Sequence, residues 1–426
     1  MIRPTPFWRS VAVLGVAGLV LTACGGDDGD DTTAEPKNDN SSSAAPAAKG
    51  DGTLVIGTLL PQTGSLAFLG PPEFAGVDLA LQDINDAGGV NGKQVEKVDS
   101  DSGDTSTDTA SQSVDRLLSN NVDAIVGAAS SSVSLSVIDK ITGAGVLEIS
   151  PANTSDELTT YDDKGLYFRT APPDVLQGRV LGDLILSDGN STVGILALQD
   201  SYGTGLAEST TKSITDGGGE VVETVVYDPK AASFSSEVGK IKAADPEAIA
   251  VIAFDETKKI IPEMVKQGIG PDTKKIYFVD GNLAGYEKDF PKGTLDGVKG
   301  TLPGVAASDE FKTRLTDLKP DLTEFAYSPE SYDATILVAL AATAAGDDSG
   351  EAISSQMQAV SEGGTKCTSY KECLDLLKND EDIDYDGVSG PVEFNDAGDP
   401  SEATIGIYQY GADNNYTFLE GKAGKI

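Results

Sequence analysis

The chain has 426 residues, and its 68 Asp and Glu against 31 Lys and Arg give a formal net charge of −37, which does not suit binding to nucleic acid or to an anionic lipid surface. It contains no histidine, which removes the commonest general base, the commonest zinc ligand and the Ser-His-Asp triad. The length predicts two domains.

The N-terminus predicts a lipoprotein export signal. Arg3 and Arg9 make the start of the chain positive, and an apolar run follows at residues 11–23. This run is short for a permanent membrane span but suits the core of a signal peptide. The run ends in "LTAC", closing at Cys24, and this resembles a bacterial lipobox, whose cysteine receives a diacylglycerol and becomes the first residue of the mature chain. An ordinary signal peptide with an incidental cysteine is the alternative.

Residues 25–50 carry almost no large apolar side chain, so they cannot bury enough surface to offset the entropy of ordering. We therefore expect a signal peptide at residues 1–23, and a lipidated cysteine with a disordered tether at residues 24–52. The mature chain is expected to work outside the cytoplasm, anchored to the cell membrane through Cys24.

From residue 53 the pattern alternates between strands and helices. Strands are predicted at 53–60, 93–100, 122–128 and 146–150. The helices between them include one at 131–145, one that carries Ala110, Val114 and Leu117, and one with apolar residues at spacings of three and four, namely Phe74, Val77, Leu81 and Ile84. This alternation predicts a parallel sheet with helices on both faces.

A second alternation follows Pro172 and Pro173. Strands are predicted at 192–198, 220–227, 248–254 and 274–280, with helices at about 174–188, from about 203, and at about 234–243 and 256–267. Three further helices are predicted at about 308–318, 329–345 and 351–361. A hairpin is predicted between residues 390–394 and residues 404–410. The fold class is α/β, with two doubly wound sheets.

Cys367 and Cys373 remain if Cys24 is lipidated. In an oxidising compartment they are expected to pair and to close a small loop. Half of a metal site is the alternative, but the chain lacks further Cys or His residues to complete one.

Residues 382–393, "DIDYDGVSGPVE", match the calcium-loop signature D-x-[DN]-x-[DN]-G-x5-E. The context argues against calcium, because such a loop needs a helix on each side, and turn residues and a strand follow Glu393. Pro391 also lies inside the loop. We therefore predict no metal and no cofactor.

Several segments together resemble one known family. "IGTLLPQTGSLAFLGPPEFAGVDLALQDINDAGGVNGKQVE", "IVGAASSSVSLSV", "ISPANTSDELT", "YFRTAPPDVLQG", "QDSYGTG" and "GPVEFNDAGDP" follow the order and spacing of the branched-chain amino-acid-binding proteins, the type I periplasmic binding proteins of ABC importers. The resemblance covers residues 53–411. It implies two Rossmann-like lobes joined by a three-crossover hinge, one at 53–172 plus 301–381 and the other at 173–300 plus 385–426.

The resemblance also implies ligand-binding residues in the first lobe. Ser131, with Ser130 and Ser132 beside it, matches the serine that binds the ligand's carboxylate, at a helix N-terminus whose N–H groups and dipole favour an anion. Ala152 and Thr154 match the backbone carbonyl and the hydroxyl that hold its ammonium. From the residues alone, the serines could instead only cap the helix, and the loop at 150–158 could be only a turn rich in capping residues.

In the second lobe, Tyr202 matches the tyrosine that closes over the ligand, and Asp280 matches the acid that faces the ammonium. Tyr202 could instead pack at a turn, and an Asp beside a glycine is often a turn former. Leu69 and Phe254 are expected in the side-chain pocket, with Phe68 and Asp255 as neighbouring candidates. An apolar wall at Leu69 fits an aliphatic or aromatic ligand.

The function implied is that of a lipid-anchored substrate-binding protein. It would bind a branched-chain or other apolar amino acid and deliver it to a membrane permease, as a monomer. The alternatives are the same fold binding an amide, a urea or a small carboxylic acid, or acting as a sensor. An enzyme is not expected, since the chain has no histidine, no nucleophile elbow and no Walker loop.

Overall fold

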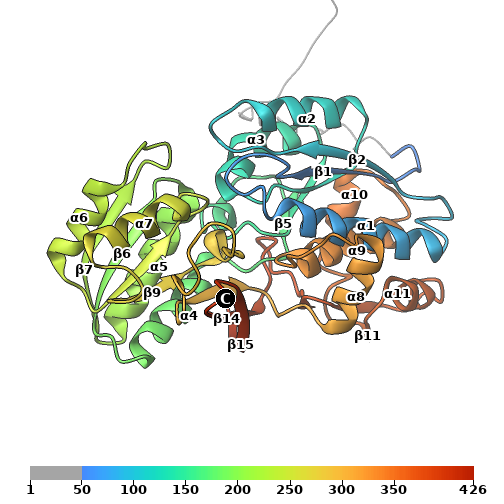
Figure 1. Ribbon diagram of the computed structural model, residues 1–426. Helices are drawn as coiled ribbons and strands as arrows, with labels where there is room; N and C mark the ends of the chain where they lie inside the picture. Colours follow the sequence, from blue (N-terminus) through green and yellow to red (C-terminus); the bar gives the residue numbers. More distant parts are fainter. Residues whose placement is uncertain (1–49) are drawn as a thin grey trace, which may run out of the picture. The chain divides into compact units, whose positions relative to one another are not determined.

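Two separate β-sheets organise the chain in the computed structural model, which describes residues 50–426 (Figure 1). The first sheet has five parallel strands in the order β2-β1-β3-β4-β5. Its strands are β1 Val55–Leu60, β2 Glu96–Asp101, β3 Ala124–Gly127, β4 Leu147–Ser150 and β5 Tyr167–Arg169. The predicted parallel sheet is therefore present.

Helices cover both faces of this sheet, and we call the sheet with these helices the first lobe. Side chains alternate along a strand, so neighbours point to opposite faces. Ile125 of β3 packs with the helices α2 Thr109–Ser119 and α3 Ser131–Gly143. Val126 packs in the opposite cluster, to which α1 Gly70–Asp86, α9 Ser328–Ala345 and α10 Gly350–Met357 contribute.

The second sheet has seven strands in the order β15-β14-β10-β9-β8-β6-β7, and with its helices it forms the second lobe. Five strands run parallel: β6 Thr192–Leu198, β7 Glu220–Tyr227, β8 Ala248–Ile252, β9 Lys275–Phe278 and β10 Lys299–Pro303. β14 Glu402–Tyr410 pairs antiparallel with both β10 and β15 Tyr416–Lys425. Every residue of β8 is buried, as expected of a strand covered on both faces.

Two helix pairs accompany the second sheet. α4 Asp174–Ser187 packs against α5 Ser201–Asp216, and α6 Ser235–Ala244 packs against α7 Thr257–Gln267. α5 ends at Asp216 and is followed by three glycines before β7, which suits the sharp return of the chain.

The chain passes between the lobes after β5, after β10 and before β14. The expected boundary at residues 300 and 301 falls inside β10, which lies wholly in the second sheet. The expected boundary at residue 385 also falls inside a strand, β12 Ile383–Gly387. Tyr385, Val392 and Phe394 pack in the first lobe's apolar core, because they fit against α9 and α11 Tyr370–Leu377.

The predicted hairpin between residues 390–394 and 404–410 is wrong. β13 Gly390–Pro391 instead pairs with β12, and β12 pairs with β11 Thr365–Cys367 in a small three-stranded sheet. β14 pairs with β15, a strand that we did not predict. The remaining helix is α8 Asp309–Leu318, and short 3₁₀ turns lie at Leu158–Thr160 (η1) and Asp280–Asn282 (η2).

Cys367 and Cys373 form a disulfide, as predicted. The stretch that matches the calcium signature is not a helix-flanked loop, because it contains the β12–β13 hairpin. Asp384 and Asp386 both lie within ion-pair distance of the Lys366 ammonium, at 3.3 and 3.0 Å.

The expected signal peptide, Cys24 and most of the expected tether lie outside the described residues. Gly50 and Gly52, at the end of the expected tether, donate backbone hydrogen bonds to Asp347 and Asp348. Among the helices of residues 50–426, none combines the length and the apolar character required to cross a membrane.

Candidate functional site

A small crevice lies where loops at the carboxyl ends of strands in both sheets meet, the usual place for ligands in open α/β sheets. It is lined by Leu66, Leu69, Ala129, Ser130, Ser131, Ala152, Tyr202, Phe254, Asp280, Gly281 and Tyr327. The volume left between these side chains is about 10 Å³. The lobes therefore meet closely around it.

Most of the residues that we expected to bind a ligand line this crevice. They are Ser130, Ser131, Ala152, Tyr202, Asp280, Leu69 and Phe254. Ser132 and Thr154 do not line it, although both lie next to residues that do. The structure thus brings residues that follow six different strands to one place.

Asp280 begins the 3₁₀ turn η2 directly after strand β9 and is 5 % exposed. Its Oδ1 accepts hydrogen bonds from the Tyr202 hydroxyl at 2.7 Å and from the Gln177 amide at 2.9 Å. Its Oδ2 accepts one from the Tyr327 hydroxyl at 2.8 Å. Burial raises the pKa of this carboxyl, and the three hydrogen bonds partly oppose that rise.

A second acid lies close to Asp280. Asp174, in the first turn of α4, is completely buried, and its pKa is raised well above the ordinary value by burial and then by the charge of Asp280. Two acids so near each other share a field that favours a cation. This side of the crevice is therefore suited to an ammonium group.

Ser131, the first residue of α3, suits an anion, whereas Asp280 suits a cation. Its Oγ accepts the backbone N–H groups of Thr154 at 3.1 Å and of Ser155 at 3.2 Å. A hydroxyl that accepts two such bonds still has its own hydrogen to donate. With the N-terminus of α3 beside it, Ser131 can donate to an anion in the crevice.

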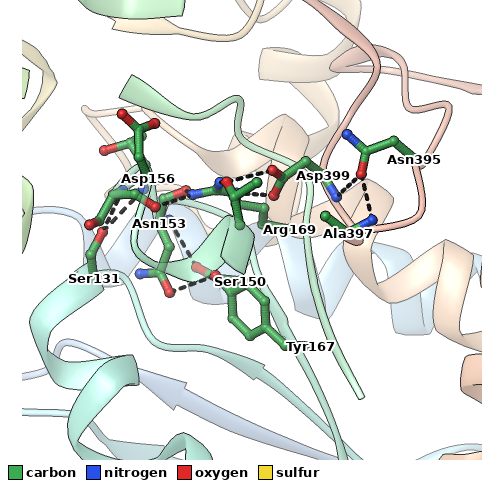
Figure 2. Close-up of polar contacts among 12 residues, drawn as sticks. Ser131, Ser150, Asn153, Asp156, Tyr167, Arg169, Asn395, Ala397 and Asp399 are labelled. Atoms are coloured by element: carbon green, nitrogen blue, oxygen red, sulfur yellow. Dashed lines mark hydrogen bonds and ion pairs between the residues drawn. The ribbon is translucent and has the colours of Figure 1, made fainter. Parts of the chain in front are cut away.

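A buried network holds the loop that follows β4 (Figure 2). The Arg169 guanidinium pairs with Asp399 at 2.6 Å, and both side chains are fully buried. Arg169 also donates to the backbone carbonyls of Asn153 and Ser155. This network fixes the backbone next to Ala152, and with it the N–H groups that reach Ser131.

Thr154 belongs to the same loop and is 1 % exposed. Its carbonyl accepts the N–H of Asp174 at 2.7 Å, so it joins the loop of the first lobe to the start of α4. Its backbone N–H also donates to the Ser131 hydroxyl oxygen, so the backbone of Thr154 connects Ser131 with the start of α4.

Ser132 points away from the crevice and toward the other lobe. Its hydroxyl donates to Asp200 Oδ2 at 3.2 Å and lies 2.8 Å from the Ser201 hydroxyl. Asp200 also caps α5 by accepting the N–H of Gly203. Ser132 thus makes a hydrogen-bonded contact between the lobes, which the sequence analysis did not predict.

Apolar side chains from both lobes complete the crevice. The rings of Tyr202 and Phe254 stack with centroids 5.4 Å apart, and Leu66 and Leu69 pack in the same buried cluster. Gly281 permits this packing, since a Cβ there would come within 2.7 Å of the Phe254 ring. The wall suits an aliphatic or aromatic group.

Sequence reasoning missed Gln177 and Tyr327. Gln177 lies on α4 and is fully buried, and Tyr327 precedes α9 with a left-handed φ of 59°. Neither residue lies in a loop at the carboxyl end of a strand, which is where ligand-binding residues of open α/β sheets are usually found. The "AYSP" segment around Tyr327 carried one signal, because a proline two residues later is typical of a helix start.

Metal chemistry finds no support in residues 50–426, where no group of three or more Cys, Asp or Glu residues is arranged to hold an ion. The architecture defines a class: a two-lobed α/β protein with a crevice between the lobes. The family model for periplasmic binding proteins matches residues 53–367, and the chain belongs to that family. The predicted resemblance is thereby confirmed.

Similar proteins of known name agree with this assignment. The chain is 26% identical over 380 residues to Leu/Ile/Val-binding protein homolog 1 of Brucella abortus, covering 86% of this chain and 93% of that protein. It is 27% identical over 364 residues to the chemotactic signal transduction system substrate-binding protein BasB of Halobacterium salinarum, covering 82% and 84%. These relatives are binding proteins, so the prediction that the chain is not an enzyme is confirmed.

Solved structures show the same fold. The isoleucine complex of the branched-chain amino acid transporter substrate-binding protein LivJ from Streptococcus pneumoniae has a TM-score of 0.70 at 23% identity, covering 88% of this chain and all of that one. A solute-binding protein of an ABC transporter from R. palustris, in complex with benzoate, has a TM-score of 0.69 at 19% identity, covering 88% and 97%. The type I periplasmic binding protein fold is thus confirmed.

Proposed function

We propose that this chain is the substrate-binding protein of an ABC importer and binds an apolar amino acid in the crevice between its lobes. The observation that carries the proposal is that one crevice is lined by the buried carboxyl of Asp280, which has the buried Asp174 near it, and by the Ser131 hydroxyl at the N-terminus of α3. An amino acid presents a positive and a negative group on one carbon, which matches this polarity.

Asp280 is the proposed partner of the ligand's ammonium. A carboxylate has about four acceptor positions, and Asp280 uses three of them for Tyr202, Gln177 and Tyr327. One position on Oδ2 remains for a further donor. The ammonium would also bring the pKa of Asp280 down, because a nearby positive charge favours the ionised form.

The ligand's carboxylate is proposed to accept hydrogen bonds from the Ser131 hydroxyl and from the Ser130–Ser131 end of α3. The Ala152 carbonyl, on the loop that Arg169 holds, would accept a hydrogen bond from the ligand's ammonium, and the Thr154 N–H would keep the Ser131 hydroxyl in place. The ligand's side chain would lie against Leu69, Tyr202 and Phe254. Ser132 would stabilise the contact between the lobes through its hydrogen bond to Asp200, and it would not contact the ligand.

Binding and closure are coupled in this proposal. Each lobe supplies part of the site, so a ligand makes all its contacts only when the lobes are together, and it shifts the equilibrium toward that arrangement. A membrane permease would recognise the closed form. We propose that the protein works as a monomer outside the cytoplasm, anchored through a lipid on Cys24.

Two alternatives have specific support. A structurally similar protein is solved with benzoate, so a small aromatic acid could lie on the Tyr202–Phe254 wall. Asp280 and Asp174 oppose this, because a ligand with no positive charge would leave them uncompensated. The second alternative is a sensor, which the similarity to a chemotactic binding protein favours. Neighbouring genes for a signalling partner, in place of permease and ATPase genes, would indicate that role.

A thermal-shift screen of the mature protein tests the proposal. Leucine, isoleucine, valine and phenylalanine are compared with leucinamide, urea, benzoate and 4-methylpentanoate, the last being leucine without its amine. We expect the amino acids to raise the melting temperature and 4-methylpentanoate to leave it unchanged. Stabilisation by benzoate or by 4-methylpentanoate, and not by any amino acid, would contradict the proposal.

A further inference from the structure

A second cavity lies beside the crevice and is much larger, with a volume of about 390 Å³. Strand β10, the segment between α8 and α9, and strands β14 and β15 contribute its walls. Tyr327 lines both spaces. A volume of this size is within the range of small-molecule sites, whereas the proposed role of the crevice makes no use of it.

Aromatic rings form one wall of this cavity. Tyr408 packs edge-on against Tyr416 and Phe418, with centroids 5.4 and 5.5 Å apart. Phe418 is 47% exposed, which is unusual for a side chain of its size. On another wall the Lys312 ammonium lies over the Phe325 ring, 5.7 Å from its centroid. The rings of the cavity thus present faces that attract a cation.

A buried acid, Glu330, also lines the cavity. Glu330, in the first turn of α9, is 2 % exposed, and within residues 50–426 no hydrogen bond reaches its buried Oε1. Gly304, at φ 92°, lies against this oxygen, since a Cβ there would fall 1.8 Å from it. A buried carboxyl without a hydrogen bond is costly, so this group is suited to a donor that the protein itself does not supply.

A second carboxylate in the cavity is already satisfied. Glu324 accepts the Gly285 N–H at 3.1 Å and the Tyr416 hydroxyl at 2.8 Å. These bonds run from the segment before α9 to the second lobe. Glu324 therefore holds the cavity's shape, and Glu330 remains for a ligand.

We propose that this cavity is a second ligand site, and that it binds a small molecule with a primary ammonium on an apolar body. The ammonium would donate to Glu330, and the body would lie on Tyr408 and Phe418. Lys312, on another wall, disfavours a second positive group and accepts a neutral or a carboxylate-bearing end. Amines and amino acids share this chemistry.

A ligand in this cavity would also bias the lobes. Its walls come from both of them, so occupancy favours the arrangement in which Glu324 contacts Gly285 and Tyr416. Tyr327, the shared wall, donates to Asp280 in the crevice. An amine bound here would therefore favour the closed form.

Titration calorimetry with benzylamine tests the site in the mature protein, with benzyl alcohol as the uncharged match and phenylalanine as the amino-acid match. We expect benzylamine to bind at least tenfold more tightly than benzyl alcohol. If phenylalanine still binds to Asp280→Asn but not to Glu330→Gln, this site binds amino acids as well. If phenylalanine does not show this pattern, the site is restricted to amines without a carboxylate.

Two variants separate this site from the crevice. Glu330→Gln is expected to weaken benzylamine at least tenfold, and Asp280→Asn to leave it within twofold. Equal affinities for benzylamine and benzyl alcohol would overturn the inference. Loss of benzylamine binding in Asp280→Asn, with binding retained in Glu330→Gln, would also overturn it. If Glu330→Gln does not fold, the half-exposed Phe418 provides a second variant: Phe418→Ala should weaken benzylamine about fivefold, and unchanged binding would overturn the inference.

The test of this second site is independent of the test of the proposed function. Leucine binding is measured in the same variants, and Glu330→Gln is expected to retain it. Benzylamine binding without binding of leucine or of any other apolar amino acid would contradict the proposed function and support this site. Leucine binding without benzylamine binding would support the proposed function and overturn this inference.

Discussion

The Tyr327 hydroxyl in the first lobe donates a hydrogen bond of 2.8 Å to Oδ2 of Asp280 in the second lobe, across 47 positions of sequence. Tyr327 has a left-handed φ of 59°, which a non-glycine residue holds only at some cost. The acid that we propose to bind the ligand's ammonium is thus also a contact between the lobes. Ligand binding and lobe closure share this carboxylate.

Asp280→Asn should weaken leucine binding at least tenfold, because the amide cannot offer a charge to the ammonium and a charged hydrogen bond contributes roughly 1.5–3 kcal/mol. Titration calorimetry measures the dissociation constant. Tyr327→Phe is the matched control: it keeps the acid and removes one donor, so its effect should be smaller. An Asp280→Asn protein with the wild-type affinity would exclude the proposed role.

Ser131→Ala should lower both affinity and stability. It removes the proposed donor to the ligand's carboxylate, and it leaves the buried N–H groups of Thr154 and Ser155 without their acceptor, at a cost of about 1–3 kcal/mol. Urea unfolding and leucine titration measure the two effects.

Ser132→Ala, one residue further along α3, is the control for the Ser131 variant. It should change stability by less than Ser131→Ala, because Ser132 is partly exposed and its bonds to Asp200 and Ser201 are only partly buried. If both variants lose the same affinity, Ser131 has no special role in holding the carboxylate.

Asp399→Ala should destabilise the protein by about 3–5 kcal/mol, because it leaves the Arg169 charge buried without its partner. The loop at residues 150–156 should loosen at the same time and leucine affinity should fall, although Asp399 does not line the crevice. Chemical unfolding and titration measure these effects. Unfolding at the wild-type urea concentration would show that Arg169 finds compensation elsewhere.

Stability should fall as the pH rises from about 5 to about 9. Burial raises the pKa of Glu148 to about 8, and those of Asp123 and Asp200 to about 7 and about 6. Because these folded-state values lie above the ordinary ones, the folded protein holds more protons. The stabilisation is full below about pH 4 and is lost as the pH passes each raised value.

Glu148→Gln tests the largest of these contributions. The amide is always neutral, so the variant should show a flatter decline of melting temperature between pH 5 and pH 9, and should be the more stable protein at pH 9. Calorimetric melts at five pH values provide the measurement. A decline as steep as that of the wild type would assign the dependence to other groups.

Some features followed from the sequence alone. The strands β6 and β7 have the bounds that we predicted, since their apolar and β-branched residues are local signals that need no partner to be read. The order of motifs identified the family, and the resemblance implied Ser131, Tyr202 and Asp280 as binding residues, which line one crevice in the structure. These conclusions depend on neighbours in the chain or on motifs shared with a known family.

Other features were decided by the tertiary structure. β14 pairs with β15 and β10 and not with residues 390–394, because the latter fit into the core beside α9. Gln177 and Tyr327 reach Asp280 only because helices α4 and α9 start beside the crevice. Which side chain of adjacent Ser131 and Ser132 faces inward depends on the rotation of α3. Such contacts join residues far apart in the chain, and packing, not local periodicity, selects them.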